Sequence, residues 1–98
     1  MKGGKDMRKI YTMYNENEQY IIKINEQDYL EIKKRTLNVD GKKLYEMMFS
    51  NFKKGDKIDI KMDRSFNSDN KLDIAVYENV KEIIEKIADR INENEEIR

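Results

Sequence analysis

Oxygen-bearing side chains stand at every second position in one short stretch of the chain: Asp63, Ser65, Asn67 and Asp69. This spacing is typical of the first half of a calcium-binding loop, in which alternate residues direct their oxygens at one hard cation. The second half of that pattern is absent, because Ser68 stands where the sharp turn needs glycine and Ile74 stands where a bidentate glutamate belongs. We therefore expect a solvated polar loop and no bound metal.

Catalytic chemistry is restricted by the residue types that the chain lacks. Its 98 residues include no histidine, cysteine, tryptophan or proline. This composition excludes the usual zinc ligand sets, the Cys and His nucleophiles and bases, and any disulfide framework. The glycines stand at positions 3, 4, 41 and 55, a spacing that matches neither a phosphate-binding loop nor a dinucleotide fingerprint. We expect a protein that is not an enzyme and uses no cofactor.

Basic residues gather in the middle of the chain, although the whole sequence carries a formal net charge of zero. The basic positions at predicted turns or element ends are Lys33, Lys34, Arg35, Lys42, Lys43, Lys53, Lys54 and Lys57. A fold that gathered them would present a phosphate-contacting patch, with Tyr11, Tyr14, Tyr20 or Tyr29 available for base stacking. The sequence pI of about 6.3 favours the plainer interpretation, in which these lysines keep a small domain soluble.

Apolar side chains on two predicted helices suggest a different surface. The candidates for a protein interface are Met47, Met48, Phe49, Phe52, Ile84, Ile87 and Ile91. A domain of this length buries only part of such a surface by itself, so a protein partner or a second copy of the chain would cover the remainder. An ordinary core of helices packed on a sheet explains the same residues, and the sequence leaves both interpretations open.

Period-two alternation predicts several strands. Residues 10–14 and 20–24 are rich in β-branched and aromatic side chains and flank a polar cluster, which predicts a hairpin. Residues 29–32 alternate apolar and charged side chains and predict a third strand. Residues 57–63 alternate without interruption and predict a further strand with one apolar face.

A helix is predicted after Asp40, which is a suitable N-cap residue. Apolar residues then recur at the spacing of one helical face: Leu44, Met47, Met48 and Phe52. Gly55 stands where a C-terminal cap belongs, so we expect a helix over residues 41–53. A strand with period-two alternation over residues 45–49 is the alternative.

The chain ends in the clearest helical stripe: Val80, Ile83, Ile84, Ile87 and Ile91. Asn79 and Glu82 resemble a capping box at the start of this helix. Residues 72–76 alternate and predict a strand before it, but they also extend the helical stripe backwards. One helix from about Asp69 is therefore the alternative to a strand followed by a helix.

The predicted elements describe an α+β domain, with a small mostly antiparallel sheet of about four or five strands and two helices packed on one face. We expect this domain to span residues 7–93, after a flexible leader of residues 1–6 and before a frayed acidic tail of residues 94–98. Whether translation starts at Met1 or at Met7 is left open by the sequence.

The sequence favours binding over catalysis. No apolar run approaches the roughly 20 residues of a membrane-spanning helix, and the first residues do not resemble an export signal. We expect a cytoplasmic bacterial protein without a membrane partner, and a non-catalytic protein-interaction or regulatory module of phage or mobile-element origin that docks on a protein or forms a homodimer. The alternatives are a nucleic-acid-binding module that uses the central lysine-rich patch and a small-molecule sensor.

Overall fold

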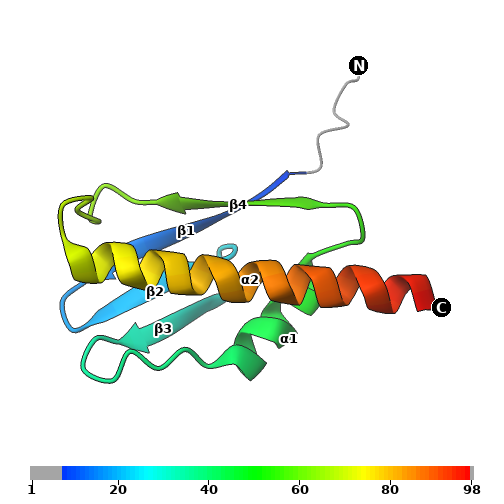
Figure 1. Cartoon of the computed structure of the whole chain (residues 1–98), viewed down its shortest axis with the longest axis horizontal. Helices are drawn as coiled ribbons and strands as arrows, with labels where there is room; N and C mark the ends of the chain where they lie inside the picture. Colours follow the sequence, from blue (N-terminus) through cyan, green and yellow to red (C-terminus); the bar gives the residue numbers. More distant parts are fainter. Residues whose placement is uncertain (1–7, 98) are drawn as a thin grey trace, which may run out of the picture.

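The computed structural model describes residues 8–97 of the chain (Figure 1). These residues form, in order, β1 (Arg8–Glu16), β2 (Gln19–Lys23), β3 (Tyr29–Lys33), α1 (Gly41–Asn51), β4 (Lys57–Met62) and α2 (Lys71–Ile97). The predicted leader of residues 1–6, and with it the choice between Met1 and Met7, lies outside the described residues. The backbone of α2 continues to Ile97, into the segment 94–98 for which fraying is predicted.

The strands form one mixed sheet in the order β3-β2-β1-β4. β1 pairs antiparallel with β2, and β2 pairs antiparallel with β3. β4 joins the sheet parallel to β1, because the chain crosses back through α1 before β4 begins. The predicted α+β class and the mostly antiparallel sheet are confirmed, and the one parallel pair is the feature that the sequence pattern did not indicate.

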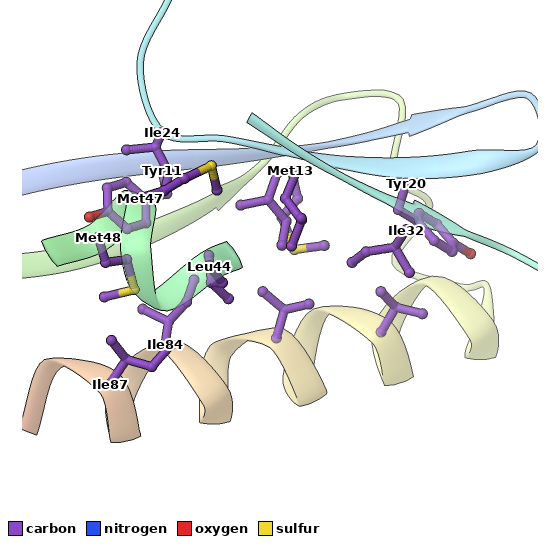
Figure 2. Packing of buried hydrophobic residues seen from close by; sticks show 14 of the residues in the cluster. Tyr11, Met13, Tyr20, Ile24, Ile32, Leu44, Met47, Met48, Ile84 and Ile87 are labelled. Atoms are coloured by element: carbon purple, nitrogen blue, oxygen red, sulfur yellow. The ribbon is translucent and has the colours of Figure 1, made fainter. Parts of the chain in front are cut away.

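One face of the sheet is apolar because buried positions alternate along the strands. Tyr11 and Met13 on β1, Ile22 on β2, and Leu30 and Ile32 on β3 all point toward the same face and are nearly inaccessible to solvent. Both helices pack on that face, as Figure 2 shows for the side chains that lie between the sheet and the two helices. The opposite face carries the intervening residues, and neither α1 nor α2 covers it.

Helix α1 begins where the sequence predicts. The Asp40 carboxylate accepts a hydrogen bond from the main-chain nitrogen of Lys43 at 3.1 Å and so caps the first turn. The helix ends at Asn51, two residues before the predicted end, and Phe52 is already extended. Gly55 has a φ of +94°, which shows that it belongs to the turn into β4.

Helix α2 begins earlier than the capping-box prediction allows. The strand predicted at residues 72–76 is wrong, and the alternative of one long helix is confirmed, with α2 starting at Lys71. Asn70 explains this start, because its side-chain oxygen accepts hydrogen bonds from the main-chain nitrogens of Leu72 (2.9 Å) and Asp73 (3.1 Å). Asn79 lies inside the helix, so the predicted capping box with Glu82 is not a cap.

Neither helix in the described part of the chain has the length and apolar character needed to cross a membrane.

Candidate functional site

The apolar candidates for a protein interface lie almost entirely inside the domain. Six of the seven belong to the core cluster: Met47, Met48, Phe52, Ile84, Ile87 and Ile91. Their burial is accounted for within one chain, by packing between the helices and the sheet (Figure 2). Phe49 differs, because its side chain is 58% exposed and its ring stacks on that of Tyr45 with the centroids 5.9 Å apart.

The basic candidates for a nucleic-acid surface do not gather on one face. Lys33 ends β3 and is opposite Gln19, which in turn is opposite Glu16 at the end of β1. Lys57 begins β4 and is opposite Arg8 at the start of β1. The nine residues of β1 therefore separate the two lysines along the strand direction by about 26 Å.

The other basic candidates lie at either end of the sheet or on α1. Lys34 and Arg35 lie directly after β3, and the ammonium of Lys34 lies 5.0 Å from the ring centroid of Tyr20. Lys53 and Lys54 lie in the connection from α1 to β4, at the other end of the sheet (Figure 1). Lys42 and Lys43 are exposed in the first turn of α1. The structure thus presents separate basic groups rather than one patch.

The stretch of alternating oxygen-bearing residues forms hydrogen-bonded turns. The Asp63 carboxylate accepts from the main-chain nitrogen of Ser65 at 3.0 Å, and hydrogen bonds from the main chain and side chain of Ser65 hold the pKa of Asp63 below its ordinary value. The Asn67 side chain accepts from the main-chain nitrogen of Asp69 at 2.9 Å. Among the described residues, no group of three His, Cys, Asp or Glu is placed to hold a metal ion.

Asp73 forms the most buried polar cluster of the described chain. Its carboxylate accepts from the Tyr20 hydroxyl at 2.7 Å, from the Asn67 main chain at 3.0 Å and from the Asn15 amide at 3.2 Å. Burial and the neighbouring carboxylate together raise the pKa of Tyr20. The contacts from Asn15 and Tyr20 join α2 to β1 and β2, so this cluster stabilises the N-terminal end of α2 against the sheet.

A hollow lies at the free edge of β3. It has a volume of about 460 Å³ and lies between this edge and α1. One wall consists of Gln27, Asp28, Tyr29, Leu30 and Glu31, and the other consists of Asp40, Lys43 and Met47. The helical residues follow i, i+3 and i+7 spacing, so they lie on one side of α1. We call this hollow the β3 groove.

Main-chain hydrogen-bonding groups of β3 point into the open side of this edge. Ile24 donates its main-chain N–H to the carbonyl of Asp28, and Lys34 donates to Glu18, both at 2.9 Å. Along an antiparallel pair, opposite residues are hydrogen-bonded to each other at every second position. Asp28 and Lys34 are hydrogen-bonded to residues on the β2 side, so the even-numbered residues of β3 between them also bond to β2. The N–H and C=O groups of Tyr29 and Glu31 therefore point away from β2.

A turn closes one end of the β3 edge and leaves the other end open. The carbonyl of Lys33 accepts hydrogen bonds from the main-chain nitrogens of Thr36 (3.2 Å) and Leu37 (2.7 Å). These bonds direct the chain away from the sheet after β3. The open part of the edge is therefore the part that carries Tyr29 and Glu31, beside the β3 groove.

Side-chain amides hold the start of this edge in place. Asn25 accepts from the main-chain nitrogens of Gln27 and Asp28, both at 2.8 Å, and so shapes the turn between β2 and β3. The Asp28 carboxylate accepts from the amides of Asn25 and Asn51, each at 3.2 Å. Since Asn51 ends α1, these contacts fix the separation between the strand and the helix that line the groove.

The groove carries more acidic than basic side chains. Its carboxylates belong to Asp28, Glu31 and Asp40, whereas Lys43 is its single basic group. A second, shallower hollow of about 360 Å³ lies on the uncovered face of the sheet, and Tyr29 and Glu31 line both hollows. The edge of β3 is therefore accessible from both sides, and the Tyr29 side chain is 49% exposed.

Most of the groove was not predicted from the sequence. Met47 was a candidate for a protein interface, Lys43 for phosphate contact and Tyr29 for base stacking. Asp28, Glu31 and Asp40 were not site candidates. The alternation of residues 29–32 correctly separates the buried from the exposed side chains of β3. Only the strand order shows that β3 is an edge, and that order follows from long-range pairing.

Comparison of the chain with protein-family models, with curated proteins and with solved structures gives no match. Its function is therefore inferred from the geometry of the described residues.

Proposed function

We propose that the chain is a non-catalytic protein-interaction module that docks on a partner protein by adding an extended segment of that partner to the free edge of β3. The observation that carries this proposal is the β3 groove, which combines an edge strand with one side of a helix. A segment added to a sheet edge gains affinity from main-chain hydrogen bonds and specificity from alternate side chains. The cytoplasmic location and regulatory role expected from the sequence belong to the same proposal.

The main-chain geometry supports this mode of binding. Tyr29 and Glu31 direct their N–H and C=O groups away from β2. An added strand pairs with the main-chain groups of every second residue on an edge, and Tyr29 and Glu31 have this spacing. α1 stands beside the edge and gives the added segment a second wall through Lys43 and Met47. The other edge of the sheet, formed by β4, is less suited to an added strand. The Tyr77 hydroxyl of α2 already donates to the Ile60 carbonyl there at 3.3 Å.

The nucleic-acid alternative has weaker support from the geometry. Lys33 and Lys57 lie at opposite ends of the sheet, and two of the four tyrosines considered for base stacking, Tyr11 and Tyr20, are buried in the core. A module that reads nucleic acid through phosphate contacts needs several basic groups within one binding face.

Substitutions at Tyr29 test the proposed function, because the N–H of this residue points outward. The Tyr29→Pro variant removes that donor while keeping the hydrogen bonds between β3 and β2, whereas the matched Tyr29→Val variant keeps the donor and loses only the ring. The probes are three labelled peptides of equal length, in which valine alternates with lysine, threonine or glutamate. Fluorescence anisotropy gives the dissociation constant of each peptide.

We expect at least one of these peptides to bind, and we expect Tyr29→Pro to bind it about tenfold or more weakly than Tyr29→Val does. Amide NMR spectra of both variants establish that each is folded. Equal affinity of the two folded variants, or no binding of any of the three peptides to the unmodified protein, would overturn the proposed function.

A further inference from the structure

We infer that the partner segment is basic, with lysine or arginine at alternate positions and small apolar residues between them. This inference rests on the proposed function, since it names the chemistry of the segment that the β3 groove takes. It is carried by the charges around the groove and by the two different surfaces on either side of the β3 edge.

The charges of the groove favour a cationic segment. Asp28, Glu31 and Asp40 contribute three carboxylates to its lining, and Lys43 contributes one ammonium group. The adjacent basic side chain on β2, Lys23, is opposite Tyr29 in the sheet and pairs with Glu26 at 3.4 Å, which offsets its charge. Opposite charges across an interface promote encounter and exclude partners of the wrong sign.

The uncovered side of the edge suits lysine or arginine. A strand that pairs with β3 places every second side chain on this side, next to Tyr29 and Glu31. The Glu31 carboxylate is exposed and would pair with a cationic group, while the half-exposed Tyr29 ring would contact the aliphatic stem or the guanidinium.

The helix side of the edge suits small apolar side chains. The alternate residues of an added strand would point into the space between β3 and α1, where Leu30 and Met47 are the apolar lining residues. Both are nearly buried, with exposed fractions of 3% and 8%, so the floor of the groove has little apolar surface left to cover. Because so little apolar area remains to be covered, a large aromatic ring would gain little there, and a small apolar side chain such as valine or alanine matches the floor.

A second copy of the chain is a less suitable occupant. Pairing of two β3 edges would bring together two identical grooves, each with the same excess of carboxylates from Asp28, Glu31 and Asp40. Like charges that meet across an interface oppose association. The proposed occupant is therefore a basic segment of another protein.

The three alternating peptides also test this inference. At low ionic strength we expect the lysine peptide to bind about tenfold or more tightly than the threonine peptide, and the glutamate peptide to bind most weakly. The advantage of the lysine peptide should shrink as salt is added, because exposed charges are screened. We expect Glu31→Gln to weaken lysine-peptide binding about threefold or more, and to weaken threonine-peptide binding by a smaller factor.

Two further variants separate a local charge effect from a general one. Asp40→Asn removes a groove charge while keeping a residue that can cap α1, and we expect it to act in the same direction as Glu31→Gln. Glu85→Gln removes one exposed charge from α2 that is not part of the groove lining, and we expect a smaller change in lysine-peptide binding than for Glu31→Gln or Asp40→Asn.

The outcomes distinguish the two proposals. If the threonine peptide binds as tightly as the lysine peptide and binding still depends on the Tyr29 N–H, the charge inference is wrong and the docking proposal holds. If no peptide binds, the docking proposal itself is wrong. If light scattering shows a stable dimer that the lysine peptide dissociates, the edge is occupied by a second copy, and the inferred partner is wrong.

Discussion

Two buried tyrosines on adjacent strands differ in how their hydroxyl groups are satisfied. The Tyr20 hydroxyl donates to the Asp73 carboxylate at 2.7 Å. The Tyr11 hydroxyl is equally buried and has no hydrogen-bond partner among the described residues. A buried hydroxyl without a hydrogen-bond partner lowers the stability of the folded state, whereas a hydroxyl that donates a hydrogen bond to a buried carboxylate raises it.

Replacing each tyrosine by phenylalanine should therefore have opposite effects. We expect Tyr11→Phe to leave the free energy of unfolding unchanged or raise it by about 1 kcal/mol, because only an unpaired polar group is lost. We expect Tyr20→Phe to lower it by about 1–3 kcal/mol, because the Asp73 carboxylate loses its shortest hydrogen bond. Denaturant unfolding measures both values, and each variant is the control for the other.

Alkaline pH gives a second check on Tyr11. Burial, together with the nearby Asp56 carboxylate, raises the pKa of Tyr11 to about 12. A tyrosine with a raised pKa in the folded state stabilises the protein fully below its ordinary pKa, and that contribution is lost as the pH rises to the folded value. The unmodified protein should thus lose more stability than Tyr11→Phe between pH 10 and 12, and equal losses would contradict the burial of this hydroxyl.

At the level of elements, a buried charged residue at the start of α2 explains why a strand was wrongly predicted at residues 72–76. Residues that face the sheet along α2 include Asp73, Val76 and Val80, at the spacing of one helical face. Because Asp73 is charged, it interrupts the apolar stripe in the sequence. Residues 72–76 then show apolar side chains at every second position, which is the pattern of a strand. Its partner Tyr20 lies 53 positions away, and no local pattern reveals that contact.

The same region yields a prediction about helix capping. We expect Asn70→Ala to lower the free energy of unfolding by about 1 kcal/mol, because the side chain of Asn70 accepts two main-chain hydrogen bonds at the start of α2. The matched control is Asn79→Ala within the helix, which should be neutral or slightly stabilising, since alanine is the better helix former. A larger loss for Asn79→Ala than for Asn70→Ala would contradict the helix start at Lys71.

The remaining elements could be predicted because their patterns are local. The first three strands, α1 and β4 were placed within a few residues by alternation, by helical spacing and by the Asp40 cap. Their faces followed as well, since Leu30 and Ile32 are buried while Tyr29 and Glu31 are not. Local patterns do not specify which strands become neighbours.

At the level of the whole molecule, the placement of β4 decides where the candidate site lies. Had β4 paired with β3, the strand before it in the chain, β3 would be an interior strand with no free edge. β4 instead pairs with β1, which leaves β3 at the end of the sheet with α1 beside it. The β3 groove therefore depends on a long-range pairing, and this explains why the sequence did not predict it.

The same arrangement explains why the predicted apolar docking surface and the predicted phosphate patch do not form. The isoleucine and methionine side chains that resembled a docking surface cover the sheet (Figure 2). Lys33 and Lys57, two of the lysines predicted to form a phosphate patch, lie at opposite ends of the sheet, and Lys42 and Lys43 lie on α1. The fold thus leaves the acidic edge groove as the best-formed candidate surface of the described chain.

Amide hydrogen exchange along β3, with and without the peptide that binds most tightly, tests the central claim most directly. In the free protein we expect Leu30 and Ile32 to exchange slowly, because they bond to β2, and Tyr29 and Glu31 to exchange quickly. Bound peptide should slow exchange at Tyr29 and Glu31. If a bound peptide leaves these two amides unprotected, the segment is not added to the edge of β3 and the proposed function is wrong.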